Sequence, residues 1–112
     1  MRVDQRGLKA KTGFVIVWEF HVTASKRGAF ETAYGPQGRW AKLFKTGAGY
    51  IRTELIRDLT SPTRYLTLDY WQSRGEYEAF RKKNVEAYAL IDEKCEALTT
   101  KEIEVGRFIL KS

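Results

Sequence analysis

One nine-residue segment, FVIVWEFHV at Phe14–Val22, restricts the fold more than any other part of the sequence. Aromatic and β-branched residues fill it, and no Gly or Pro interrupts it, which is typical of a β-strand. Successive side chains of a strand point to opposite faces. One face of this strand is entirely apolar, and the other begins apolar with Val15 and Val17 before it reaches Glu19 and His21. A strand of this kind belongs in the centre of a sheet that is covered on both faces.

A helical region and a hairpin follow the first strand. Apolar residues recur at threes and fours between residues 26 and 44, with an interruption at Gly35-Pro36, and this spacing predicts two short helices. The alternating segments 50–57 and 64–72 predict two strands. Asp, Ser and Pro between them are turn residues, so these two strands should pair as a hairpin.

The last third of the chain predicts a second helical region and a final strand. Ser73 and Glu76 form an S-x-x-E capping box, which marks the start of a helix. Its apolar spacing continues to about Leu98, and we predict a break near Asn84 because an unbroken helix would be too long for so small a domain. The alternating segment 102–110 predicts the last strand.

These elements give the order strand, helix, strand, strand, helix, strand. This βαββαβ order predicts an α+β, ferredoxin-like fold with a four-stranded, mainly antiparallel sheet and both helical regions on one face. The other face would expose a row of apolar side chains, namely Val15, Val17, Leu66, Leu68 and Tyr70. Such a patch is unusual on a monomer. A second copy packed sheet against sheet would cover it, so we predict a homodimer with these residues in its interface.

The N-terminal end differs from the rest of the chain. Residues 1–13 contain four basic residues and one acidic residue and no hydrophobic periodicity. We therefore predict a flexible basic tail over 1–13 and a single domain over 14–112, a length that suits one hydrophobic core. The net charge is +6, and half of it lies in this tail. The remaining excess is small, so no nucleic-acid partner is predicted.

Cysteine usage and hydropathy bear on the cellular location. Cys95 is the single cysteine, which rules out an internal disulfide and fits a reducing compartment. No apolar run approaches the roughly 20 residues of a membrane helix, and no apolar signal segment follows the N-terminus. We predict a cytoplasmic protein with no membrane partner.

Most familiar catalytic arrangements are missing. His21 and Cys95 are the only residues of their types, so neither a metal centre nor a Ser-His-Asp triad is predicted. Gly47 and Gly49 precede a predicted strand, whereas a phosphate-binding loop precedes a helix. Cys95 lies on an apolar helical stripe, where a buried, inert thiol is expected.

Aromatic residues converge on the face that the helices should cover. Trp18 and Trp71 lie on two predicted strands, beneath rings from the helical regions that include Trp40, Tyr77 and Phe80. These rings either fill a solid core or bound a flat cavity for a planar ligand. Asp69 shares the face of Trp71, and a carboxylate there costs several kcal/mol unless it is paired or wet. It therefore indicates a polar cavity, or an ion pair with Arg52 or Arg107.

The run WQSRGEYEAF from Trp71 to Phe80 has the pattern W-x-S-x-x-x-Y/F-x-x-F. It resembles the junction between the third strand and the following helix in the antibiotic biosynthesis monooxygenase superfamily. The strand VWEFHV, the stripe Phe30–Tyr34 and the dipeptide Gly49-Tyr50 are similar to the same superfamily. The resemblance extends over residues 14–110.

This resemblance implies a dimeric α/β barrel with one pocket per subunit between helices and sheet. Members of the superfamily include cofactor-independent quinone-forming oxygenases and haem-degrading enzymes. The oxygenases hold a phenolic substrate with an Asn four residues before the Trp, where this chain has Thr67. The haem-degrading members use an Asn on the first strand and a His on the second helix. Here Trp18 matches the first position and no His matches the second, so haem degradation is not predicted.

The resulting hypothesis is a cofactor-independent monooxygenase-like enzyme that acts on a planar phenolic or polyketide-like aromatic, with no cofactor and no metal. Asp69 is the predicted catalytic residue, either as the base or as the group that orients it. The predicted substrate-binding residues are Trp18, Trp40, Thr67, Trp71, Tyr77 and Phe80.

Two other functions compete with this hypothesis. The first is a non-catalytic dimeric module that binds a small hydrophobic ligand or a protein partner, and the missing Asn and His favour it. The second is an RNA-binding module, since some of these share the βαββαβ order. The predicted third strand, RYLTLDYWQ, lacks the basic-Gly-aromatic pattern of such modules, which disfavours RNA binding.

Overall fold

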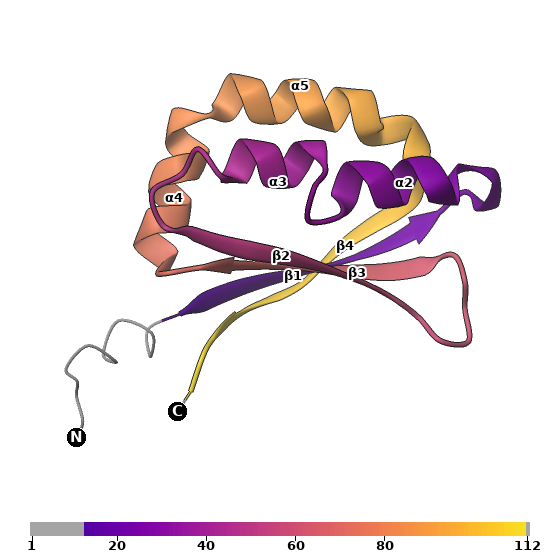
Figure 1. Ribbon diagram of the computed structural model, residues 1–112, viewed down its shortest axis with the longest axis horizontal. Coiled ribbons are helices and arrows are strands. Elements are labelled where there is room, and N and C mark those ends of the chain that lie inside the picture. Colours follow the sequence, from indigo (N-terminus) through magenta and orange to yellow (C-terminus); the bar gives the residue numbers. More distant parts are fainter. Residues whose placement is uncertain (1–12, 112) are drawn as a thin grey trace.

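The computed structural model describes residues 13–111, with four strands beneath a layer of helices (Figure 1). The elements in chain order are β1 Phe14–Val22, η1 Ala24–Lys26, α2 Arg27–Tyr34, α3 Arg39–Phe44, β2 Tyr50–Arg57, β3 Arg64–Trp71, α4 Arg74–Lys83, α5 Val85–Cys95, η2 Glu96–Leu98 and β4 Thr99–Ile109. The predicted α+β, ferredoxin-like fold is confirmed. The basic tail predicted for 1–13 lies outside the described residues, apart from Gly13.

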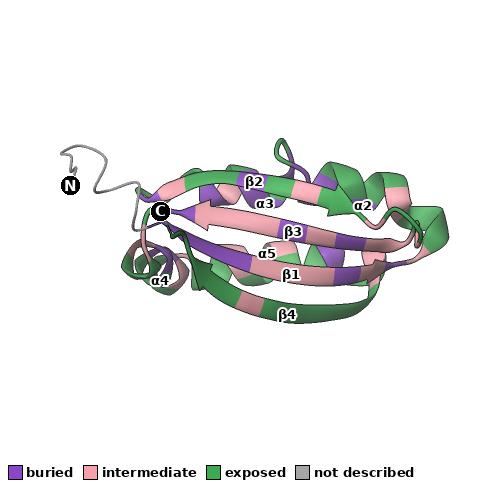
Figure 2. Ribbon diagram, turned by 90° about the horizontal axis from the view of Figure 1, so that it is seen from below, coloured by how far each residue is buried: buried purple, intermediate pink, exposed green. Residues whose placement is uncertain are grey.

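The strands form one sheet in the order β2-β3-β1-β4, and its three neighbouring pairs are antiparallel. The two aromatic strands β1 and β3 are therefore central, as their apolar character predicts. β4 begins at Thr99, three residues before the predicted start, and ends at Ile109. All the helices lie on one face of the sheet, and the other face is open in the view from below (Figures 1 and 2).

The register between β1 and β3 assigns side chains to the two faces. Trp71 lies opposite Phe14, Asp69 opposite Ile16 and Thr67 opposite Trp18. Paired residues of an antiparallel ladder share a face. Phe14, Ile16 and Trp71 belong to the buried cluster beneath the helices. The prediction that Trp18, Asp69 and Trp71 share the helix-covered face is therefore confirmed.

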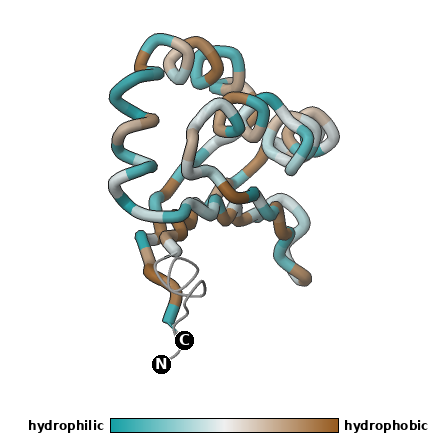
Figure 3. The backbone as a smooth tube through the Cα atoms, turned by 60° about the vertical axis from the view of Figure 1, so that its left-hand side comes forward, coloured by the Kyte–Doolittle hydropathy of each residue, from teal (hydrophilic) through white to brown (hydrophobic). Residues whose placement is uncertain are grey.

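The second helical region is interrupted at Asn84, as predicted. α4 ends at Lys83 and α5 begins at Val85, and the Asn84 side chain donates a hydrogen bond of 3.0 Å to the Phe80 carbonyl oxygen. At the start of α4, Ser73 Oγ accepts a 3.1 Å bond from the Glu76 N–H, as the capping box predicts. α4 buries only Tyr77 and Phe80, and the rest of this helix is largely hydrophilic (Figure 3).

A β-bulge changes the faces along β4. Val17 pairs with Gly106, and the next residue, Trp18, pairs with Glu104, so Val105 is left out of the ladder. A bulge shifts the alternation of the bulged strand by one residue. As a result, the side of β4 beneath the helices carries Glu102 and Glu104 beyond this point.

The open face of the sheet is apolar in its centre. Val17, Leu66, Leu68 and Tyr70 are each partly exposed there, with Phe108 and Ile103 exposed on the neighbouring strand β4. Val15, which we predicted to meet a partner, is already buried within the single chain. It lies between Tyr70 and Phe108 in the ladder, so both of its neighbours across the strands are large aromatic residues.

Candidate functional site

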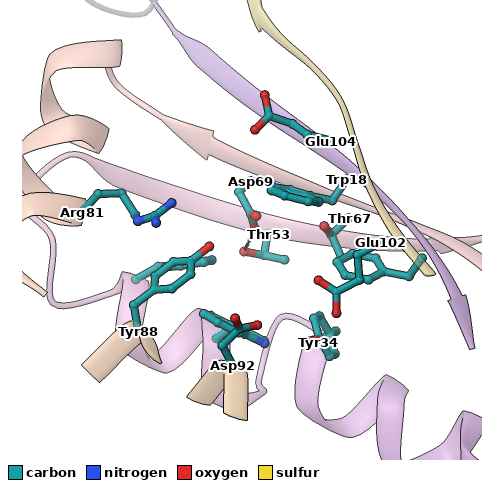
Figure 4. Close-up of a pocket in the computed structure, with 13 residues that line it drawn as sticks. Trp18, Tyr34, Thr53, Thr67, Asp69, Arg81, Tyr88, Asp92, Glu102 and Glu104 are labelled. Carbon is teal, nitrogen blue, oxygen red and sulfur yellow. Dashed lines mark hydrogen bonds between the residues drawn. The ribbon is translucent and has the colours of Figure 1, made fainter. Parts of the chain in front are cut away.

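A cavity of about 330 Å³ lies between the helices and the sheet (Figure 4). It is open to solvent on one side and combines aromatic walls with several charged groups. The lining residues are Trp18, Phe20, Tyr34, Trp40, Phe44, Thr53, Thr67, Asp69, Arg81, Tyr88, Asp92, Glu102 and Glu104. Some of the aromatic residues on the helix-covered face therefore bound a cavity, and the others form a solid core beside it.

Asp69 lies in the sheet wall of this cavity. Thr53 Oγ1 donates to Asp69 Oδ1 at 2.6 Å, and because its hydrogen is used there, it accepts from the Tyr50 hydroxyl at 2.8 Å. Both residues belong to β2, the strand next to that of Asp69. This short relay orients the carboxylate and leaves its second oxygen for a ligand.

The predicted ion-pair partners of Asp69 lie elsewhere. Arg52 stacks over the Tyr70 ring on the open face of the sheet and pairs with Glu54. Arg107 pairs with Glu104 at 3.0 Å. No cation is paired with Asp69 within residues 13–111, so the structure favours a polar cavity over an ion pair.

Loss of water around Asp69 changes its protonation. Burial raises the pKa of the Asp69 carboxyl to about 6, and the hydrogen bond from Thr53 lowers it by less. A carboxylate with such a pKa is ionised at neutral pH and accepts a proton more readily than an ordinary aspartate. These are the properties of a general base.

Three other residues predicted to bind substrate line the same cavity. Thr67 is buried beside Trp18, its partner in the β1–β3 ladder. Trp40, from α3, is only 7% exposed, and its indole N–H has no acceptor among the described residues. Thr67 therefore adds a hydroxyl to the sheet wall of the cavity, next to the ring of Trp18.

Trp71, Tyr77 and Phe80 do not line the cavity. Trp71 is fully buried, and its ring centroid lies 5.5 Å from that of Tyr77 and 5.1 Å from that of Phe80. Gly47 lies against the same rings, so closely that an added Cβ would be 2.9 Å from Trp71. We assign these three side chains to the core that supports the cavity wall. Sequence spacing could not separate them from the lining residues, because both groups occupy the same face.

Arg81 is a lining residue that the sequence did not suggest. Its guanidinium carbon lies 3.9 Å from the centre of the Tyr88 ring, and its Nη1 donates to the Tyr77 hydroxyl at 2.9 Å. Within residues 13–111 it has no carboxylate partner. In the sequence, Arg81 opens the run Arg-Lys-Lys at the end of α4, which looks like a solvated surface. The only available signal was its i+4 spacing from Tyr77, which puts both side chains on one helix face.

Asp92, Glu102 and Glu104 were also missed. Asp92 comes from α5, and the two glutamates come from β4 after the bulge at Val105. Uninterrupted alternation would have turned Ile103 and Val105 toward the helices instead. In the part of the chain that the structure describes, no three His, Cys, Asp or Glu residues gather closely enough to hold a metal ion. None of the described helices is long and apolar enough to cross a membrane.

Comparisons with known proteins agree with this architecture. The family model of antibiotic biosynthesis monooxygenases matches residues 13–85. SnoaB, a cofactor-independent oxygenase from Streptomyces nogalater, is 18% identical with a TM-score of 0.66, over 90% of this chain and 95% of SnoaB. A conserved protein from Methanosarcina mazei is 16% identical with a TM-score of 0.70, over 93% of this chain and 98% of that one. PA3566 from Pseudomonas aeruginosa is 14% identical with a TM-score of 0.65, over 90% and 96%. No curated protein matches the sequence.

Proposed function

The chain belongs to the antibiotic biosynthesis monooxygenase family, and from this premise we propose that it is a cofactor-independent oxygenase of a planar phenolic or polyketide-like aromatic. One observation carries the proposal. Asp69 lies in a cavity with flat aromatic walls. The pKa of its carboxyl is raised, and no cation among the described residues is paired with it. Such a cavity offers stacking surfaces to a ring and a base to its acidic hydrogen.

The first step would be removal of a proton from the bound substrate. Trp18 and Trp40 stack against the ring, and Thr67 donates a hydrogen bond to one of its oxygens. Asp69 accepts the proton from the phenol or from the acidic carbon conjugated to it. Arg81 lies on the same side of the cavity as Tyr88 (Figure 4), where its charge would stabilise the resulting oxyanion.

The second step would consume molecular oxygen. The carbanion-like substrate anion transfers one electron to O2, and the radical and superoxide combine to form a carbon–oxygen bond. The resulting peroxide anion takes back the proton that Asp69 accepted and becomes a hydroperoxide, which regenerates the base. The hydroperoxide then loses water: the O–O bond breaks, the carbon loses its remaining hydrogen, and a quinone carbonyl forms. One oxygen atom stays in the product and the other leaves as water, so the substrate supplies all the electrons.

Oxygen uptake tests this proposal directly. We expect the purified protein to consume one O2 per quinone formed from an anthrone-like phenol, at the same rate with and without a chelator. An oxygen electrode and the quinone absorbance measure the two quantities. Absence of uptake across a panel of such phenols that demonstrably bind in the cavity would contradict the proposal.

The pH dependence of the rate follows from Asp69. Because the base works only when deprotonated, kcat/KM should be low below pH 5, rise through an apparent pKa near 6 and level off above pH 7. Initial rates between pH 4.5 and 8.5 measure this profile. A rate that stays flat across pH 6 would exclude Asp69 as the base.

A non-catalytic ligand-binding module is the second candidate. Thr67 is the observation that favours it, because the resemblance to the oxygenases calls for an Asn at that position. A hydroxyl offers one donor where an amide offers both a donor and an acceptor group. In that case the protein would bind planar aromatics without consuming oxygen.

A homodimer is also part of the proposal. Phe108 and Ile103 are exposed, at 50% and 37%, on the open face of a strand at the edge of the sheet. Together with Leu66, Leu68 and Tyr70, they offer a second copy a continuous apolar surface and would complete the dimeric α/β barrel. The cytoplasmic location stays a prediction from the single, buried cysteine.

A further inference from the structure

We infer that one end of the cavity, formed by Asp92 and Glu102 beside Trp18, Tyr34 and Trp40, binds a basic nitrogen. The ligand is then a planar aromatic that carries an ammonium group on the side away from the oxygen that Asp69 deprotonates. The inference deepens the proposed function, and it rests on that function only for the orientation of the ring.

The charge of the cavity is opposite to that of the chain. The whole chain has a net charge of +6, yet the cavity lining contains four carboxylates and one guanidinium. Glu104 is neutralised by Arg107, which lies 3.0 Å away. Asp92 and Glu102 have no Lys or Arg nitrogen within 4 Å among residues 13–111. Two carboxylates at the cavity mouth therefore remain without a positive partner.

Arg81 and Glu102 lie on different sides of the cavity, and Asp92 lies between them, below the cavity in the view of Figure 4. Figure 4 shows Arg81 on one side next to Tyr88, and Glu102 with Tyr34 on the opposite side. Glu102 pairs with Phe20 in the β1–β4 ladder, two pairs along from Trp18 and Glu104 and therefore on the same face. A ligand with an acidic oxygen at one end and an amine at the other would have each group next to the opposite charge.

Rings surround the acidic end. The ring centroids of Trp18 and Phe20 are 6.3 Å apart, and those of Tyr34 and Trp40 are 6.1 Å apart. The face of an aromatic ring attracts a cation, and Trp attracts it most strongly. An organic ammonium group can pair with the carboxylates and lie against the aromatic faces at the same time.

Trp40 spans the middle of the cavity. Its ring centroid lies 4.7 Å from that of Tyr88 and 6.1 Å from that of Tyr34. Its side chain is 93% buried, and its indole N–H, which has Tyr34 and Cys95 as polar neighbours, has no acceptor at hydrogen-bond distance among the described residues. A buried donor without a partner costs free energy, which a ligand acceptor would recover. A carbonyl or ether oxygen on the aromatic ligand would supply that acceptor.

Three acridines that differ in charge test the inference. 9-Aminoacridine is a cation at pH 8, acridine is neutral, and acridine-9-carboxylate is an anion, while the ring system is the same. We expect the cation to bind at least about tenfold more tightly than the anion, with acridine between them. Fluorescence anisotropy of each probe at low salt measures the dissociation constants.

Charge-neutralising variants locate the effect. Glu102→Gln and Asp92→Asn should each weaken binding of 9-aminoacridine by about threefold, the scale of an exposed ion pair, and leave acridine unchanged. Arg81→Gln should strengthen cation binding. Glu93→Gln removes the acidic neighbour of Asp92 that does not line the cavity, and it should change nothing.

Three binding results would each overturn the inference: the three probes bind equally, the anion binds more tightly than the cation, or the cation does not bind. The inference would also be wrong if Glu102→Gln and Asp92→Asn both left binding of the cation unchanged. Its failure is distinguishable from that of the proposed function. A cation preference without oxygen uptake by any phenol removes only the oxygenase, and uptake without a cation preference removes only the basic-nitrogen site.

Discussion

Replacement of Asp69 by Asn is expected to lower kcat/KM for oxygen uptake by at least about a hundredfold, the usual contribution of a positioned general base. Asn keeps the size of the side chain and can still accept the Thr53 hydrogen bond, but it cannot take a proton from the substrate. Binding of a planar aromatic should change little, since the ring walls are untouched. Initial-rate measurements at pH 8 and a titration with a neutral aromatic probe separate these two effects.

The same variant should be more stable than the wild type at high pH. The folded-state pKa of Asp69 is raised from 3.8 to about 6, so ionised Asp69 destabilises the folded protein. Each pKa unit is worth 1.36 kcal/mol, and allowing for the partial exposure of the group we expect about 2 kcal/mol. This destabilisation is complete above about pH 7, decreases as the pH falls through 6, and disappears below about pH 3, where the carboxyl is protonated in both states.

Urea unfolding at pH 8 and pH 4 measures this gain, which should be complete at pH 8 and mostly lost at pH 4. Glu93→Gln, an exposed change on α5, is the control and should affect neither rate nor stability. An Asp69→Asn protein that is fully active would contradict the base assignment. One that is less stable at pH 8 would show that hydrogen bonding of the carboxylate outweighs its desolvation.

Sedimentation velocity is expected to give twice the mass of one chain for the wild type and the mass of a single chain for Leu68→Glu. Leu68 lies opposite Val17 on the open face and next to Glu54 of β2. A buried carboxylate without a partner costs several kcal/mol, and two-fold symmetry introduces two of them. The dissociation constant of the dimer should rise at least about a hundredfold.

Leu90→Glu is the matched control, because Leu90 is 58% exposed on α5, in the helix layer on the other side of the sheet. This variant should remain a dimer. Far-UV circular dichroism of both variants checks that the fold is kept. A wild-type chain that sediments as a monomer at micromolar concentration, or a Leu68→Glu protein that remains dimeric, would exclude the proposed sheet-to-sheet interface.

The sequence predicted the elements well because each had a local physical cause. β-branched and aromatic residues without a breaker defined β1, and the capping box at Ser73 defined the start of α4. The break at Asn84 followed from the length of helix that a small domain accommodates. The two faces of the central strands followed from alternation alone, which correctly put Trp18 and Asp69 beneath the helices.

The candidate site was only partly predictable. Asp69 stood out because a carboxylate on an apolar face needs a reason. Trp18, Trp40 and Thr67 line the cavity with it, while Trp71, Tyr77 and Phe80 fill the core beside it. Alternation and helical spacing give the face of a side chain, but whether the rings on that face close together or leave a gap depends on how the helices are set above the sheet.

The sequence by itself determined the fold class, the two apolar faces of β1 and the unusual position of Asp69, because these depend on the period of each element. Only the tertiary structure decided which side chains meet in the cavity. The bulge at Val105 shifts β4 by one residue and turns Glu102 and Glu104 toward the helices, and the way α5 is set against α4 after the break at Asn84 brings Tyr88 to Arg81. Register shifts and helix placement arise from contacts between distant segments, which no local pattern contains.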